Sequence, residues 1–146
     1  MQGRGDHSGV TILIDGLWPA TSTVEGRFRA DNLPPGIHQV RASHLGYLSR
    51  LGSTAQCQLG FLTEMPATTL LGGDSNNDKR VNLFDLVRVG ASYRTCAGQE
   101  EFAPEADINQ TGCVDIFDLV LVGINYGLTG PADWSFPVTS ARTHGQ

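Results

Sequence analysis

Two segments of the chain carry oxygen-bearing side chains at the spacing of a calcium-binding loop. The first is residues 74–85 (DSNNDKRVNLFD), and the second, residues 107–118 (DINQTGCVDIFD), repeats it thirty-three residues later. A calcium ion binds roughly six to eight oxygen atoms at about 2.3–2.6 Å, and a twelve-residue loop supplies them from positions 1, 3, 5, 7, 9 and 12. The pattern therefore predicts two calcium ions, with a structural rather than a catalytic role.

Oxygen atoms are available at each of these positions in both loops. The first loop offers five side chains and the backbone carbonyl of Arg80, and its predicted ligands are Asp74, Asn76, Asp78, Arg80, Asn82 and Asp85. The second loop offers the carbonyl of Cys113 in the same way, and its predicted ligands are Asp107, Asn109, Thr111, Cys113, Asp115 and Asp118.

Two residues depart from the general pattern of such loops. Lys79 holds position 6 of the first loop, where glycine is usual because the chain turns sharply there. Position 5 of the second loop is the uncharged Thr111. We therefore expect strain in the first loop and weaker ion binding in the second.

The internal repeat extends beyond the ligands into two apolar segments. Residues 83–93 (LFDLVRVGASY) and 116–126 (IFDLVLVGINY) are identical at most positions. A single Asx-rich segment is often an ordinary turn, because Asn and Asp side chains bond to nearby backbone. Two copies at a fixed offset, each followed by a matching apolar run, favour a loop followed by a helix, twice.

Residues 73–127 resemble the dockerin family, a calcium-dependent module that docks onto cohesin. The resemblance rests on GD-x-N-x-D followed by V-N/D-x-x-D-L and a helix, in two copies. It implies a cohesin-type protein partner and a non-catalytic role: tethering a secreted or cell-surface protein to a cohesin-bearing scaffold, as in polysaccharide degradation. The partner contacts implied by the family are Leu83, Phe84, Gly90, Ala91, Ile116, Phe117, Gly123 and Ile124. The alternative for Phe84 and Phe117 is packing between the two helices, and the periodicity is compatible with both.

The first half of the chain has the pattern of β-strands. Strands are expected at residues 10–14, 26–30 and 37–42, separated by turn-forming residues such as those at 33–36 (LPPG). Residues 9 to about 70 resemble the carboxypeptidase-regulatory-like family, also classed with carbohydrate-binding-like or prealbumin-like sandwiches. That resemblance implies an accessory β-sandwich without hydrolytic activity. Because the family usually has one more strand before Val10, we expect the sandwich to be truncated, with an exposed edge.

The sequence thus predicts two modules and a tail. Residues 1–71 form an N-terminal all-β sandwich, and residues 72–128 form a small all-α dockerin-like pair of calcium loop-helix motifs. Residues 129–146 are a C-terminal tail, in which we expect Trp134 and Phe136 to fold back and cap the C-terminal module.

The cysteines indicate one disulfide. The count of three is odd, so at most two can pair within the chain. We expect Cys96 to pair with Cys113, because a bridge there closes a short connection in a module with little core. Cys57 is then left over. The four histidines are scattered and there is no C-x-x-C motif, which argues against zinc.

Composition excludes several functional classes. The net charge of −5, with no basic cluster, argues against nucleic-acid binding, and no apolar run reaches the ~18 residues needed to cross a bilayer. No nucleophile and base can be assembled, so we expect no enzyme. The N-terminal residues lack the pattern of a signal peptide, so we expect a fragment of a longer secreted or cell-surface protein.

Two alternatives to docking remain open. One is a secreted, calcium-stabilised adhesion or structural domain that meets no cohesin, which the apolar residues of the two helices suit equally well. The other is carbohydrate binding by the sandwich, for which Trp18 and Tyr47 are the candidate aromatics. We favour it less, since Tyr47 lies in a Gly-Tyr turn of the kind that such folds use for packing.

Overall fold

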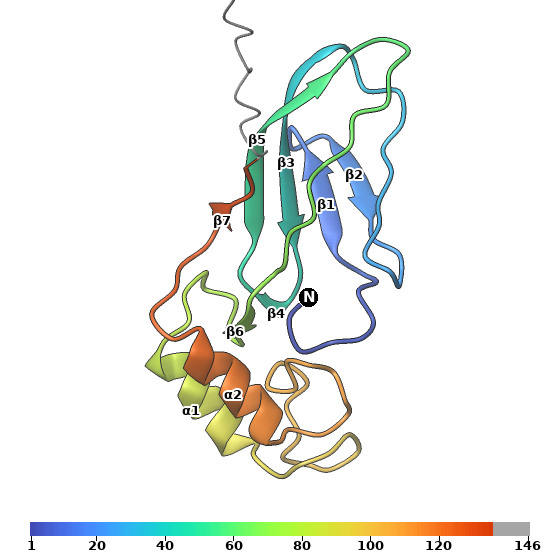
Figure 1. The fold of residues 1–146 in the computed structure, drawn as a ribbon. Coiled ribbons are helices and arrows are strands. Elements are labelled where there is room, and N and C mark those ends of the chain that lie inside the picture. The colour runs from blue at the N-terminus through green and yellow to red at the C-terminus, as the bar shows by residue number, and fades with distance from the viewer. Residues whose placement is uncertain (136–146) are drawn as a thin grey trace, which may run out of the picture.

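The protein is described from a computed structural model, which covers residues 1–135 apart from the side chains of residues 53 and 54. Most of its regular structure is β-sheet (Figure 1). The main sheet has the order β2-β1-β3-β5-β7, and its strands are β1 (Thr11–Ile14), β2 (Trp18–Thr21), β3 (Gly36–Ser43), β5 (Arg50–Cys57) and β7 (Ala132–Asp133). A two-stranded sheet pairs β4 (Gly46–Tyr47) with β6 (Gly72–Asp74). The helices are α1 (Leu83–Ala91) and α2 (Ile116–Ile124).

All strand pairs are antiparallel except that of β5 with β7, which is parallel. Strands β1 and β3 align Thr11 with Ser43 and Leu13 with Arg41. Because side chains alternate across a strand, these four residues share one face of the sheet. The opposite face carries the buried residues Ile12, Ile14, Val40 and Ala42.

Within residues 1–135, no second sheet covers the buried face. Side chains from the connecting segments pack against the core instead, including Phe28, Leu33 and Met65. Trp134 adds to this cover: its ring centroid lies 6.3 Å from that of Phe28, and its indole N–H donates to the Pro66 carbonyl at 2.8 Å. The N-terminal part is therefore one sheet covered by irregular chain.

The helices lie below the sheet in Figure 1, joined to it by apolar and polar contacts. Val89 and Val122 are fully buried between the helices and the rest of the core. The hydroxyl of Tyr47 lies 3.0 Å from the Gln2 carbonyl and 3.1 Å from the Ile108 carbonyl. One apolar core therefore runs from the sheet to the helices.

The predicted fold class is wrong. The structure is mostly β-sheet with two short helices of nine residues each, and not a sandwich followed by an all-α pair. The segments that flank the helices account for the difference. Residues 72–74, which end at the first residue of the first loop, form β6 and pair with β4. Residues 132–133, placed in the tail, form β7 and pair with β5.

Two further expectations about local structure need correction. Residues 26–30 form no strand, although they alternate, because Phe28 and Ala30 pack on the core without a strand beside them to complete a ladder. Trp134 does fold back, but it covers the sheet and not the helices. Phe136, named with it, lies outside the described residues. Within residues 1–135, no helix has the length and apolar character needed to cross a membrane.

Candidate calcium loops and docking face

The two loops form matching turns. Position 4 has a positive φ in both, 58° at Asn77 and 56° at Gln110. Position 6 also has a positive φ, 70° at Lys79 and 92° at Gly112. Lys79 therefore occupies the left-handed conformation that glycine adopts at the same position of the other loop, which is unfavourable for a residue with a Cβ.

Hydrogen bonds from the backbone aim the carboxylates inward in the first loop. Asp74 accepts from the N–H groups of Asp78 and Lys79, both at 3.0 Å. Asp85 accepts from the N–H of Asn76 at 3.2 Å through one oxygen and from the N–H of Asn82 at 2.8 Å through the other. The first and last residues of the loop are thus fixed by the backbone they enclose.

The second loop repeats this network. Asp107 accepts from the N–H groups of Thr111 at 3.0 Å and Gly112 at 2.8 Å. Asp118 accepts from the N–H of Asn109 at 3.1 Å and from that of Asp115 at 2.9 Å. Two sequences that differ at many positions therefore fold into the same loop.

Each helix begins with a capping box. Asn82 and Asp115 are the N-cap residues, and each accepts from the N–H two positions later at 2.8 Å. Asp85 and Asp118 complete the boxes by accepting from the N-cap N–H groups. The carboxylate at loop position 12 is therefore also the residue that fixes the first turn of the helix.

The two copies also pair with each other in a symmetric way. The N–H of Val81 donates to Leu128 after α2, and Gly127 donates back to Val81. The N–H of Val114 donates in the same way to Thr95 after α1, and Arg94 donates back to Val114. Each loop is thus tied to the end of the other copy's helix, as a half-turn symmetry requires.

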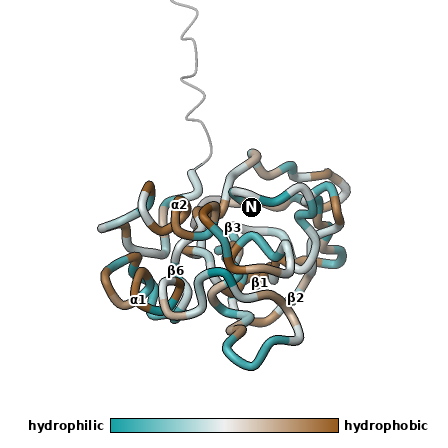
Figure 2. The backbone as a smooth tube through the Cα atoms, turned by 90° about the horizontal axis from the view of Figure 1, so that it is seen from below, coloured by the Kyte–Doolittle hydropathy of each residue, from teal (hydrophilic) through white to brown (hydrophobic). Residues whose placement is uncertain are grey.

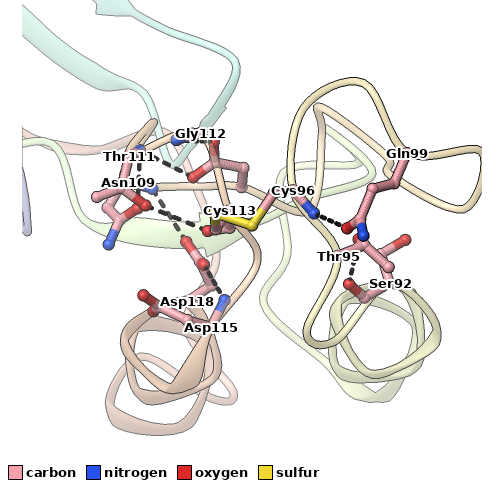
Figure 3. Close-up of a disulfide and its surroundings, with 11 residues drawn as sticks. Ser92, Thr95, Cys96, Gln99, Asn109, Thr111, Gly112, Cys113, Asp115 and Asp118 are labelled. Carbon is pink, nitrogen blue, oxygen red and sulfur yellow. Dashed lines mark hydrogen bonds between the residues drawn. A yellow bond between two sulfur atoms is a disulfide. The ribbon is translucent and has the colours of Figure 1, made fainter.

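The disulfide joins these two copies. Cys96 and Cys113 are bonded, as expected, and the bond links the connection after α1 to position 7 of the second loop (Figure 3). Cys57 is free and partly buried. The backbone at position 7 of the second loop is therefore held covalently.

Burial and like charges make the loops electrostatically unfavourable without a cation. Burial is the main reason that the pKa of Asp74 is raised to about 6, with contributions from the charges of Asp85 and Asp78 and against the hydrogen bonds from the N–H groups of Lys79 and Asp78. Burial likewise raises the pKa of Asp118, with a contribution from Asp107. Side-chain ion pairs in the described residues are confined to Arg29 with Asp31 and His38 with Asp15, so no cationic side chain pairs with these carboxylates.

The donor set of the first loop fits a divalent cation. Carboxylate oxygens of Asp74, Asp78 and Asp85 all lie within 4.8 Å of one another. Ligands about 2.3–2.6 Å from one ion are separated by up to roughly 5 Å, so one ion can contact all three. In the second loop Thr111 replaces the carboxylate of Asp78, and its hydroxyl lies 3.1 Å from the Cys113 carbonyl. Asp115 replaces Asn82, so that loop also has three carboxylates, but among the described residues only those of the first loop converge within 4.8 Å.

The residues predicted to contact a partner are all exposed. The phenylalanine side chains do not form a core between the helices, because Phe84 is 72% exposed and Phe117 is 63% exposed. Gly90 and Gly123 have no atoms within 4 Å of where a Cβ would lie. The other four exposed positions are Leu83, Ala91, Ile116 and Ile124. In the view from below in Figure 2, brown, hydrophobic stretches lie along both helices. We call the eight residues the docking face.

Sequence reasoning predicted twelve calcium ligands, which stay a prediction, and it missed a polar contact that holds α2. Gln2 accepts from the Gly72 N–H at 3.2 Å and from the Asn125 side chain at 2.6 Å, which in turn donates to the Gly72 carbonyl. No local signal reveals this contact, since Gln2 and Asn125 lie at opposite ends of the chain. The capping boxes, by contrast, are readable from the sequence.

Comparison with solved structures finds the same fold. One similar chain belongs to a C-terminal interface mutant of a type II Cohesin-X-Dockerin complex from Acetivibrio cellulolyticus, with a TM-score of 0.70, 19% identity, and coverage of 84% of this chain and 83% of that chain. Another belongs to an N-terminal interface mutant of the same kind of complex, with a TM-score of 0.69, 18% identity and the same coverage. No protein-family model matches the sequence, and no curated protein matches it. The chain therefore shares the fold of a component of these complexes.

Proposed function

We propose that this chain is a non-catalytic docking module that binds a cohesin-type protein through the docking face of α1 and α2. The observation that carries the proposal is the exposure of large apolar side chains at the same positions of two symmetric helices. Phe84 and Phe117 are each more than half exposed, and both lie in the first turn of a helix whose start is fixed by its N-cap. Exposed apolar patches of this kind are typical of protein interaction sites.

Calcium in both loops would hold this face in place. Asp74, Asp78 and Asp85 would bind the first ion together with Asn76, Asn82 and the Arg80 carbonyl. The ion would supply charge neutralisation to carboxylates that form no ion pair with a cationic side chain among the described residues. The second ion would bind the corresponding residues of the second loop, with Thr111 in place of a carboxylate.

A secreted or cell-surface location suits this proposal. The disulfide between Cys96 and Cys113 is typical of proteins that fold in an oxidising compartment. Extracellular calcium would fill even weak sites. The β-sheet part would then act as a rigid support for the helices in an assembly for polysaccharide degradation.

The symmetry of the two copies suggests two binding orientations related by a half-turn. Surface plasmon resonance with the cohesin of the Acetivibrio cellulolyticus type II complex, and with other cohesins in parallel, tests both ideas. We expect Phe84→Ser or Phe117→Ser alone to leave binding largely intact and the double variant to abolish it. Ile37→Ser is the matched control, because Ile37 is 70% exposed but lies at the far end of the sheet.

Two outcomes would contradict the proposal. One is that the calcium-loaded, folded chain binds none of the cohesins. The other is that the double variant binds as well as the unmodified chain. If no cohesin binds, the alternative of a calcium-stabilised structural domain is favoured, and the packing of α2 on β6 is compatible with it.

A further inference from the structure

A cavity of about 290 Å³ lies between the open face of the sheet and the first loop. Its wall includes Thr11 and Ser43, which pair across β1 and β3, and Arg41, two residues earlier on β3. Lys79 and Asp74 of the first loop line it from the other side. It is therefore separate from the docking face.

The cavity wall has two cationic side chains, Arg41 and Lys79, and one carboxylate, Asp74. This part of the surface is therefore positive, although the chain has a net charge of −5. Neither Arg41 nor Lys79 takes part in an ion pair among the described residues. His44, also in the wall, is hydrogen-bonded through Nδ1 to the Leu45 carbonyl at 2.8 Å, and its Nε2 lies 3.3 Å from the guanidinium of Arg4. Because Arg4 can only donate, His44 accepts from it and is neutral.

The titration of His44 agrees with this charge distribution. Burial lowers its pKa, and the positive charge of Arg4 lowers it further. An anion in the cavity would meet unpaired cations on both walls. A planar carboxylate suits a guanidinium in particular, since the two can form paired hydrogen bonds.

The other polar side chains of the cavity wall indicate which kind of ligand would bring a carboxylate into the cavity. The hydroxyls of Thr11, Ser43 and Ser49 line the same cavity and can both donate and accept hydrogen bonds. The volume is near the lower end of the roughly 300–1,000 Å³ typical of small-molecule sites, which is room for a single sugar ring. We propose that this cavity binds a hexuronic acid residue, with Arg41 and Lys79 on its carboxylate and the three hydroxyls on its ring.

One residue in the wall opposes anion binding. The carboxylate of Asp74 would repel the ligand, although it already accepts two backbone hydrogen bonds. If calcium binds the first loop, as proposed above, it would neutralise Asp74, and uronate binding would then be tighter with calcium than with chelator. The contribution of Arg41 to uronate binding does not depend on calcium in the first loop.

A titration of the whole chain with methyl β-D-glucuronide, followed by chemical shifts of backbone amides, tests this proposal. Methyl β-D-glucoside is the matched probe without the carboxylate, and N-acetylglutamate amide presents a carboxylate without the sugar. We expect the glucuronide to bind, to shift amides around Arg41 and Ser43, and to bind more tightly than either control probe.

Arg41→Gln should weaken glucuronide binding about tenfold, because it removes a hydrogen bond to a charged group. Lys79→Gln removes the other cation and serves as a second variant should Arg41→Gln fail to fold. Arg88→Gln on α1 makes the same charge change outside the cavity and should have no effect.

Equal binding of glucuronide and glucoside would overturn the proposal. So would tighter binding of N-acetylglutamate amide, the absence of binding, or binding unaffected by both cavity variants. Cohesin binding measured on the same Arg41→Gln chain distinguishes failure here from failure of the proposed function, because Arg41 lies on β3, outside the docking face.

Discussion

The Nδ1 atom of His38 lies 2.6 Å from the Oδ2 atom of Asp15. On the other side of the ring, Nε2 lies 2.7 Å from the carbonyl of Pro34. Both partners are acceptors, so both ring nitrogens must carry a proton to bond to them. The buried imidazole of His38 is therefore a cation, and it joins the turn after β1 to the start of β3.

We expect this pair to make stability depend on pH. The hydrogen bond to Asp15 raises the pKa of His38 above 6.5, with a further contribution from Pro34, and the same bond lowers the pKa of Asp15. A raised histidine pKa gives stability that is fully present below 6.5 and is lost as pH rises through the folded-state value. The melting temperature should therefore fall as the pH rises above 6.5.

Asp15→Asn tests the assignment, because it removes the charge that stabilises the imidazolium. The variant should melt lower than the unmodified chain at acidic pH and show a weaker fall on going to neutral pH. Asp31→Asn, in an exposed ion pair with Arg29, is the control. A melting temperature that does not change in this range would contradict the assignment.

The disulfide should contribute substantially to stability. Cys96 and Cys113 are 17 residues apart, and closing a loop of that size stabilises by about 3 kcal/mol through the unfolded chain. We expect Cys96→Ala with Cys113→Ala to lower the free energy of unfolding in urea by about that amount. Cys57→Ala should keep the bridge and change stability much less, and equal effects of the two replacements would argue against the predicted role.

Calcium should stabilise the chain through two unequal sites. Binding to the folded state alone adds about 2.7 kcal/mol at a hundredfold excess over the dissociation constant. Because three carboxylates converge in the first loop, Asp74→Asn should remove the tighter site and Asp107→Asn the weaker one. Titration calorimetry of the chelator-treated chain measures both, with Asp31→Asn as the control. No heat of binding at millimolar calcium would exclude the ion.

Substitutions at position 6 of the two loops should change the free energy of unfolding in opposite directions. Gly112→Ala places a Cβ at a φ of 92° with no atoms nearby to clash, so its cost of about 1–2 kcal/mol is conformational. Lys79→Gly relieves the same strain but adds freedom to the unfolded chain, for a net gain of up to about 1 kcal/mol. Urea unfolding of both variants measures this difference, and a loss of stability in both would show that Lys79 is not strained.

The parts of the fold that the sequence predicted well are local. The loops and helix starts depend on residues within a dozen positions of one another, such as Asp74 with Lys79 and Asn82 with Asp85. The disulfide was predictable for the same reason, because Cys96 and Cys113 flank one short connection. The strand at residues 10–14 and that at 37–42 also appear, as β1 and β3.

The errors concern contacts between distant segments. Strand β7 is only two residues long, and its pairing with β5 spans more than 80 residues, so no pattern in the sequence reveals it. The division after residue 71 follows the change in sequence pattern and remains a prediction. In the structure, one apolar core contains residues from both sides of residue 71. The Tyr47 hydroxyl also donates to the Ile108 carbonyl on the other side of that division. The contact between His38 and Asp15 could not be predicted either, because the two residues are 23 positions apart in the sequence.

The capping boxes give each loop an internal reporter. Asp85 protects the amide of Asn82 from solvent, and Asp118 protects that of Asp115. Hydrogen exchange at these two amides measures how often each helix start opens, one copy at a time. Since any ion in a loop and any protein on the following helix turn act on the same opening, each would slow this exchange, and by thermodynamic linkage each would strengthen the binding of the other.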